Sequence, residues 1–281
     1  RGRGMRMLLY RAIFKSDSKR TGEDTAIGLR IQSPGRNGRM KKTTWRRAEG
    51  RLDNQMRPIA FQRSYLDFAE GSCLVSFGRT KVICAASIDD QVPPFLIGSG
   101  QGWITAEYSM LPKSTRQRTP RDRAKSGRSH EIQRLIGRSL RGITDLTRLG
   151  ERTIYIDCDV VQADGGTRSA AISGAALALH DALYFMKKNQ IIQEWPLREL
   201  AAAVSVGLVE GRVCLDLDFS EDSMADVDFN VVKTESGKFI EIQGTAEHNT
   251  FDMDQLKQFL ETAEEGIQRI LQAQREALAA G

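Results

Sequence analysis

A strand-like run ends and a long alanine-rich segment begins at the sequence DGGTR, residues 164–168. Residues 153–161 before it alternate and finish on an apolar pair, which predicts a largely buried strand. Residues 169–186 after it are rich in alanine, also contain leucine and isoleucine, and lack proline, which predicts a helix. The rest of the chain is organised around this strand–turn–helix connection.

The residues of DGGTR are suited to binding an anion. Its two glycines permit a tight turn and a close approach of a ligand to the backbone. The first turn of a helix has free N–H groups and a partial positive charge, and the guanidinium of Arg168 can bind two oxygens of a phosphate. Taken alone, the stretch fits an ordinary connection with a solvated arginine equally well.

The composition of the whole chain narrows the class of protein. The 281 residues are 40% hydrophobic and 27% charged, and no apolar run approaches the roughly 20 residues of a membrane helix. We therefore expect a soluble globular protein with no membrane partner. The formal net charge of +5 weakly favours a polyanionic partner. The four cysteines lack CxxC spacing and the histidines are scattered, so we expect reduced core thiols, a cytoplasmic location and no zinc site.

Residues 1–44 differ in composition from the rest of the chain. Arginine and lysine far outnumber the acids Asp17, Glu23 and Asp24, and no periodicity is sustained. We expect a basic, disordered N-terminal extension followed by one folded domain over residues 45–281. The extension fits three roles equally well: a basic arm for nucleic acid, an organelle-targeting peptide, or translated sequence upstream of a start at Met40.

The next part of the chain predicts strands and then a basic loop. Short β-prone runs at residues 65–69, 72–77 and 81–87 predict an antiparallel meander, and residues 103–111 predict another strand. Residues 112–128 carry seven cations against one acid and have no apolar anchor. We expect this loop to be mobile without a ligand and to bind a phosphate backbone, with a solvated surface as the alternative.

An amphipathic pattern over residues 129–149 predicts a helix that Gly150 ends. Arg128 then lies at the start of a second helix. Two helix starts, each with an arginine, could be the two halves of one anion site, and the sequence alone leaves their convergence open.

The last part of the chain repeats the order of strands followed by a helix. Residues 201–209, 212–218, 227–233 and 238–243 are β-prone, and residues 252–279 predict a final amphipathic helix. This order predicts an α+β fold of two similar halves.

An acidic cluster lies between two of these late strands. Glu221, Asp222, Asp226 and Asp228 fall within eight residues. In a strand Asp226 and Asp228 would share a face, and Asp222 could fold back toward them. Clustered carboxylates can hold Mg²⁺ with phosphate oxygens and water, and an acidic turn with an aspartate cap is an equally good interpretation.

Several long motifs, taken in order, resemble the ribonuclease PH family. The resemblance covers residues 46–279 without large gaps, although the basic loop is a few residues shorter than in relatives. It is closer than the resemblance to polynucleotide phosphorylase, which has two such domains and appended RNA-binding modules. The motifs that carry it are RRAEGR at residues 46–51, QMRP at 55–58, GWITAEY at 102–108, EIQRL at 131–135, QADGGTR at 162–168, EDS at 221–223 and QGTAE at 243–247.

The resemblance implies an activity, a fold and an assembly. The activity is phosphate-dependent 3′-to-5′ exoribonuclease activity, a nucleotidyltransferase reaction that trims extra 3′ nucleotides from tRNA precursors and other RNA 3′ ends and releases nucleoside diphosphates. The fold is the α+β ribonuclease PH fold, in which two similar halves of the ribosomal protein S5 domain 2-like kind pack as one domain. The assembly is a homo-hexamer built as a trimer of dimers. Inorganic phosphate would be the co-substrate and Mg²⁺ the cofactor.

The resemblance also implies roles for particular residues. Both acids are expected to serve catalysis and metal binding, and the sequence does not separate the acid from the metal ligand. The residues are Arg128, Gly166, Thr167 and Arg168 for phosphate, Asp222 and Asp228 for catalysis and Mg²⁺, and Arg116, Arg118, Arg121 and Arg123 for tRNA.

Two alternatives remain beside phosphorolysis. One is a hydrolytic 3′ exonuclease on the same scaffold, which would need a metal-bound water instead of a phosphate site; the pair Arg128 and Arg168 argues against it. The other is a non-catalytic, exosome-like RNA-binding ring subunit. Such subunits generally lack one or more of the phosphate and carboxylate residues, and this chain has all of them.

Overall fold

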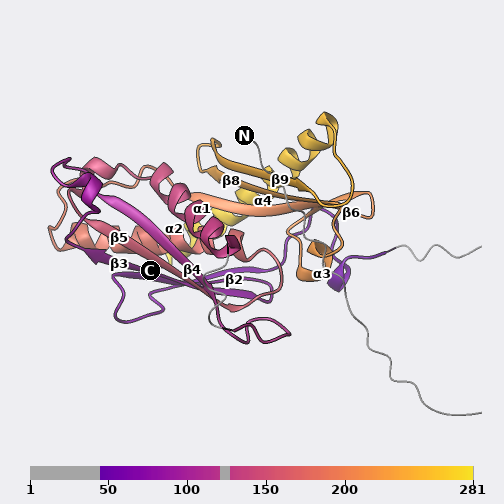
Figure 1. Ribbon diagram of the computed structural model, residues 1–281, viewed down its shortest axis with the longest axis horizontal. Coiled ribbons are helices and arrows are strands. Elements are labelled where there is room, and N and C mark those ends of the chain that lie inside the picture. Colours follow the sequence, from indigo (N-terminus) through magenta and orange to yellow (C-terminus); the bar gives the residue numbers. More distant parts are fainter. Residues whose placement is uncertain (1–44, 121–126, 281) are drawn as a thin grey trace, which may run out of the picture. The chain divides into compact units, whose positions relative to one another are not determined.

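Two β-sheets pack against one central helix in the computed structural model (Figure 1). The structure describes residues 45–120 and 127–280, so the expectations for residues 1–44 lie outside the described residues. The helix is α2, Thr167–Lys188, which packs on strands β2 and β3 of the first sheet and on strand β6 of the second. The predicted α+β fold of two halves is confirmed.

The first sheet has the strand order β1-β2-β3-β5-β4. Its neighbours are antiparallel except β4 and β5, which are parallel because helix α1 connects them. The strands are β1 Ile59–Arg63, β2 Gly71–Phe77, β3 Thr80–Asp89, β4 Trp103–Met110 and β5 Thr153–Gln162.

The second sheet has the strand order β7-β6-β8-β9 and is antiparallel throughout. Strands β6 and β7 are joined by Glu210 and Gly211, both with positive φ, as a two-residue hairpin turn requires. The strands are β6 Ala201–Val209, β7 Arg212–Leu215, β8 Val227–Thr234 and β9 Phe239–Ala246.

Three further α-helices complete the described part of the chain. They are α1 Gly127–Gly142, α3 Phe219–Asp222 and α4 Met253–Ala279, with short 3-10 helices η1 Ala48–Gly50, η2 Pro94–Leu96 and η4 Leu146–Leu149. Helix α4 begins at a capping box in which Asp252 and Gln255 each satisfy the backbone of the other. It covers β6, β7 and β8, as α2 covers the first sheet.

Small residues let the sheets approach α2 closely. At the start of β2, a Cβ atom on Gly71 would lie only 2.0 Å from the carbonyl oxygen of Ala178. Only glycine fits at this contact, because helix backbone occupies the space of a side chain. The alanine-rich composition of α2 therefore serves packing on two sides, which fixes the position of its first turn between the sheets.

Three predicted elements are wrong in detail. The strand predicted over residues 212–218 ends at Leu215. Residues 65–69 form no strand, because Ser64 adopts a left-handed φ of 53° and turns the chain out of β1. The predicted helix over residues 129–149 ends at Gly142, and Asp145 caps the separate 3-10 helix η4. Periodic apolar spacing continues through both helices, which is why the sequence suggested one.

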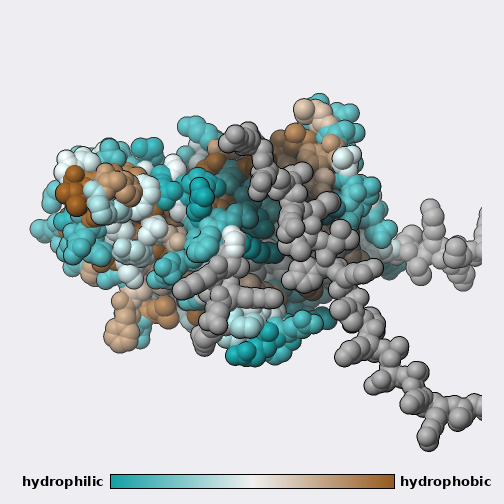
Figure 2. All heavy atoms as spheres, viewed as in Figure 1, coloured by the Kyte–Doolittle hydropathy of each residue, from teal (hydrophilic) through white to brown (hydrophobic). Residues whose placement is uncertain are grey.

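On the face shown in Figure 2, hydrophilic residues predominate and hydrophobic residues form separate patches. Within residues 45–120 and 127–280, no helix is both long enough and apolar enough to cross a membrane.

Candidate active site

The turn between β5 and α2 is pressed against the second half of the fold. Gly165 and Gly166 have φ angles of 77° and 66°, which glycine tolerates. A Cβ atom at residue 165 would lie 2.5 Å from the carbonyl oxygen of Leu217, so no other residue fits there. Gly166 supplies no side-chain cap to α2, and no acidic residue lies in the first turn of this helix. This turn can therefore receive an anion.

Thr167 opens α2 and contacts Tyr108 of β4. The Tyr108 hydroxyl donates a 2.8 Å hydrogen bond to Thr167 Oγ1, and both residues are buried. Burial raises the pKa of Tyr108, while the charges of Arg128 and Arg168 act in the opposite direction. Arginines from the starts of two different helices therefore lie near one hydroxyl, which is the convergence that the sequence left open.

The two arginines differ in how firmly they are held. Arg128 is the second residue of α1 and is exposed. The side chain of Arg168 is 17% exposed, and its Nη1 lies 3.9 Å from Glu131 Oε1. The same Nη1 donates a 2.9 Å hydrogen bond to Gln243 Oε1. Residues of α1 and β9 thus position the guanidinium of Arg168.

Two carboxylates lie in the field of these arginines. Asp222 ends α3 and Asp228 is the second residue of β8. Burial is the main cause that raises the pKa of each; the charge of Asp228 raises the pKa of Asp222 further, and Arg128 and Arg168 oppose the shift. At Asp228 the opposing effects include a 3.0 Å hydrogen bond from Asn230 Nδ2 to Oδ1. The four charged groups form one electrostatic cluster.

The other acids of this segment have structural partners. Asp218, just before the acidic cluster, caps α3 by accepting from the backbone N–H groups of Ser220 and Glu221. Asp226 lies before β8 and accepts a 2.8 Å hydrogen bond from Asn249. Asp226 does not share a strand face with Asp228, because the strand begins at Val227 and only Asp228 lies in it.

A cavity of about 1350 Å³ brings the predicted site residues together. Arg121 and Arg123 lie outside the described residues. The predicted residues on its wall are Arg116, Arg118, Arg128, Gly166, Thr167, Arg168, Asp222 and Asp228. Residues from both halves of the fold thus form one wall. In the described part of the chain, no group of three or more histidine, cysteine or acidic side chains could hold a metal ion.

The first half of the basic loop is anchored. Ser114 is 4% exposed, and its carbonyl oxygen accepts a 2.9 Å hydrogen bond from the N–H of Ala163, just before the glycine turn. The N–H of Thr119 donates a 2.7 Å hydrogen bond to the carbonyl of Pro112. Backbone hydrogen bonds therefore attach residues 112–120 to the segment that leads into the glycine turn.

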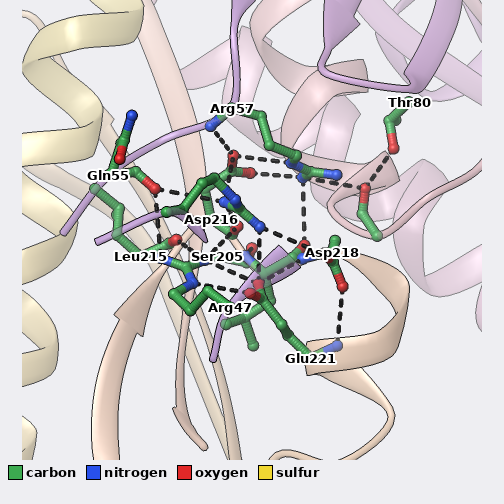
Figure 3. A network of polar contacts seen from close by, with 12 residues as sticks. Arg47, Gln55, Arg57, Thr80, Ser205, Leu215, Asp216, Asp218 and Glu221 are labelled. Carbon is green, nitrogen blue, oxygen red and sulfur yellow. Dashed lines mark hydrogen bonds and ion pairs between the residues drawn. The ribbon is translucent and has the colours of Figure 1, made fainter. Parts of the chain in front are cut away.

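A buried network of ion pairs supports the cavity wall (Figure 3). Nε and Nη2 of Arg47 donate 2.8 Å hydrogen bonds to the two carboxylate oxygens of Glu221 in α3. Arg57 binds Asp216 in the same bidentate manner, at 2.9 and 2.6 Å, and its Nη1 donates to the carbonyl of Asp164. The network therefore holds α3, which carries a candidate carboxylate, and the turn that precedes the anion site.

The sequence assigned no role to several of these residues. Asn230 follows Asp228 by two positions, and strand alternation could have placed both on one face. Tyr108, Gln243 and Arg57 lie in motifs that carry the resemblance, but their contacts gave no local signal, because their partners are far away in the sequence.

The ion pair between Arg47 and Glu221 yields a test of stability. Glu221→Gln should lower the free energy of unfolding by about 3–5 kcal/mol, because it leaves the buried guanidinium without its charge partner. Urea titration measures the loss. As a control, Glu235→Gln at the half-exposed pair with Arg275 should cost less than about 1 kcal/mol. Similar losses in the two variants would contradict a special role for the buried pair.

Family comparisons agree with the motifs and the fold. Residues 55–183 match the 3′ exoribonuclease family, domain 1, and residues 199–266 match the same family, domain 2. The chain belongs to the 3′ exoribonuclease family. A curated ribonuclease PH of Corynebacterium kroppenstedtii is 54% identical over 235 residues, covering 83% of this chain and 92% of that protein. Another, of Synechococcus sp. (strain JA-2-3B'a(2-13)), is 55% identical over 239 residues, covering 84% and 98%.

Two solved structures have the same fold as this chain. The crystal structure of rice (Oryza sativa) Rrp46 superposes with a TM-score of 0.68 at 25% identity, covering 83% of this chain and 100% of that one. The Archaeoglobus fulgidus exosome with RNA bound to the active site gives a TM-score of 0.69 at 19% identity, covering 80% and 91%. The predicted resemblance to ribonuclease PH and the predicted fold are confirmed.

Proposed function

We propose that the cavity between the starts of α1 and α2 is where this 3′ exoribonuclease brings inorganic phosphate and the 3′ end of RNA together. Its activity follows from the family and the curated relatives: the chain is a phosphorolytic 3′-to-5′ exoribonuclease, a nucleotidyltransferase that processes tRNA with phosphate as co-substrate. The observation that carries the proposed site is the convergence of Arg128, Arg168, Asp222 and Asp228 on one cavity.

The phosphate site is assigned to Arg128, Arg168 and the first turn of α2. Inorganic phosphate is both the nucleophile and an anion, and it must approach an anionic phosphodiester. Two guanidinium groups and the N–H groups beside Gly166 and Thr167 offset that repulsion and orient the attacking oxygen toward the phosphorus. The hydroxyl of Thr167 accepts a hydrogen bond from Tyr108, so its own proton can be donated to the phosphate.

The carboxylates Asp222 and Asp228 are assigned to the leaving group and to Mg²⁺. Their raised pKa values mean that one of them can keep a proton at a higher pH than an ordinary aspartate and can deliver it to the departing 3′ oxygen. Two carboxylates also fit Mg²⁺, which completes its shell with water and phosphate oxygens. When bound, the ion would stabilise negative charge in the transition state.

We assign tRNA binding to the basic loop, residues 112–128. Arg116 and Arg118 line the cavity beside the phosphate site, and we propose that Arg121 and Arg123, which lie outside the described residues, also bind tRNA. These cations can bind backbone phosphates of the tRNA stem while the 3′ end reaches the reacting groups. We also propose a cytoplasmic location, supported by the free, buried state of the cysteines in the described residues.

We further propose that the chain assembles as a homo-hexamer, a trimer of dimers. The motifs shared with the ribonuclease PH family support this assembly, and an archaeal exosome core has the same fold, with a TM-score of 0.66 at 19% identity. Sedimentation equilibrium should give a mass six times the 31.3 kDa of one chain. A mass of one or two chains at micromolar concentration would overturn the hexamer.

Phosphate dependence tests the proposed site. A tRNA with extra 3′ nucleotides should shorten only when phosphate or arsenate is present, because the arginine site holds the nucleophile. Chromatography should identify nucleoside diphosphates as the products with phosphate. Nucleoside monophosphates formed in phosphate-free buffer would favour the hydrolytic alternative instead.

A further inference from the structure

Phe219 is an aromatic side chain that faces solvent inside the candidate active site. It is 59% exposed and lies on the wall of the same cavity as Asp222 and Asp228. Phe219 begins α3 and Asp222 ends it. Residues three apart on a helix lie on one side of it, with Cβ atoms about 5–6 Å apart. The ring therefore lies beside a carboxylate that we assign to the reaction.

The helix that carries the ring is held firmly. Asp218 and Glu221 form a capping box at the start of α3. Glu221 is 1% exposed and is bound by Arg47 and by Arg51, whose Nη2 lies 3.0 Å from Glu221 Oε2. The backbone that carries the ring is therefore in position before a ligand arrives, so the entropy lost on binding is chiefly that of the side-chain rotamers.

We infer that the ring of Phe219 is a stacking platform for a base of the RNA, in one of the two nucleotides that flank the scissile phosphodiester. The inference rests on the proposed function of the cavity. The guanidinium groups there are assigned to phosphates, although arginine can also stack on a base, and a carboxylate does not recognise the flat face of a base. An aromatic ring does, and it accepts every base because each has a π-face. A trimming exonuclease that removes successive nucleotides needs such a sequence-tolerant contact.

RNA binding in phosphate-free buffer tests the platform without cleavage. The probes are a short single-stranded RNA and two copies that lack the base at the last or at the penultimate nucleotide. Base–aromatic stacking is expected to be worth about 5- to 150-fold in affinity. Phe219→Ala should weaken binding of the complete RNA by a factor in this range. One of the two abasic RNAs should bind the unaltered protein more weakly by a similar factor and should show no further loss with Phe219→Ala.

Controls separate stacking from a general disturbance of the site. Phe219→Trp should restore the affinity, and Met224→Ala, a half-exposed residue just after α3 that is not on the cavity wall, should leave it unchanged. The KM for phosphate should not change in Phe219→Ala, and its thermal unfolding should match that of the unaltered protein.

Two results would overturn the platform: unchanged RNA affinity in Phe219→Ala, or a loss of the same size for the complete RNA and for both abasic RNAs. Failure of the proposed function is distinguishable from these results. In that case RNA would not be shortened in the presence of phosphate, while the RNA affinity would still depend on Phe219 and on one of the two terminal bases.

Discussion

Replacing Arg128 or Arg168 by alanine should reduce phosphorolysis about 100-fold or more while the fold is retained. Each change removes a cation that offsets repulsion between phosphate and the phosphodiester, and such contacts contribute most in a site shielded from water. Arg168 is the less exposed of the two and is held by Gln243 and Glu131, so its loss should be the more severe. Steady-state rates with phosphate as the varied substrate measure the effect.

Arg134→Ala provides a matched control for these variants. Arg134 is exposed on the same helix as Arg128 but is not on the cavity wall, so its replacement should leave the rate within about twofold of normal, as most surface changes do. Near-normal turnover of both Arg128→Ala and Arg168→Ala at saturating phosphate would place the anion site elsewhere in the molecule.

Asp222→Asn and Asp228→Asn should each abolish most of the activity while RNA binding is kept or improved. Asparagine keeps the size of the side chain but removes the charge, the proton donor and the strong affinity for Mg²⁺. General acid catalysis alone contributes about 10²- to 10⁴-fold, and repulsion of the RNA phosphates is relieved at the same time. Single-turnover rates and RNA affinity should be measured in parallel.

The roles of the two carboxylates can then be separated with Mg²⁺. If excess Mg²⁺ restores one variant and not the other, the restored position is chiefly a ligand and the other is the acid. Asp226→Asn serves as the control, because Asp226 binds Asn249 and is not on the cavity wall. Full activity of both Asp222→Asn and Asp228→Asn would show that the acidic segment is only a structural turn.

Asp222→Asn should also stabilise the folded protein near neutral pH. Burial and the charge of Asp228 raise the pKa of Asp222 above its value in the unfolded chain. The stability linked to that group is therefore complete below the unfolded pKa and is lost as the pH rises through the folded pKa. Removing the charge restores this stability, so the melting temperature should rise at pH 7 in metal-free buffer.

The gain should shrink as the pH falls toward about 4, the ordinary value for aspartate. Thermal unfolding at a series of pH values between 4 and 8 measures it. A melting temperature that falls at pH 7 would show that Asp222 stabilises the fold through its charge, contrary to the raised pKa.

The sequence by itself determined most elements of this fold and the identities of the residues proposed for the site. Apolar periodicity and the glycines of DGGTR report on local backbone, so they placed β5, the start of α2 and the final helix within one or two residues. The long motifs identified the family. Local signals failed where a turn interrupted a periodic pattern, as at Ser64 and Gly142.

Only the tertiary structure decided which of these residues meet. Arg128, Arg168 and Asp222 lie in different elements, and no local pattern states that their side chains share one cavity. The same holds for the pair of Arg47 and Glu221, 174 positions apart. Such contacts depend on how α2 packs between the two sheets, and that packing is set by the shapes of surfaces built from distant segments. The residue types thus determine which chemical groups are available, and the packing determines how these groups are arranged in the site.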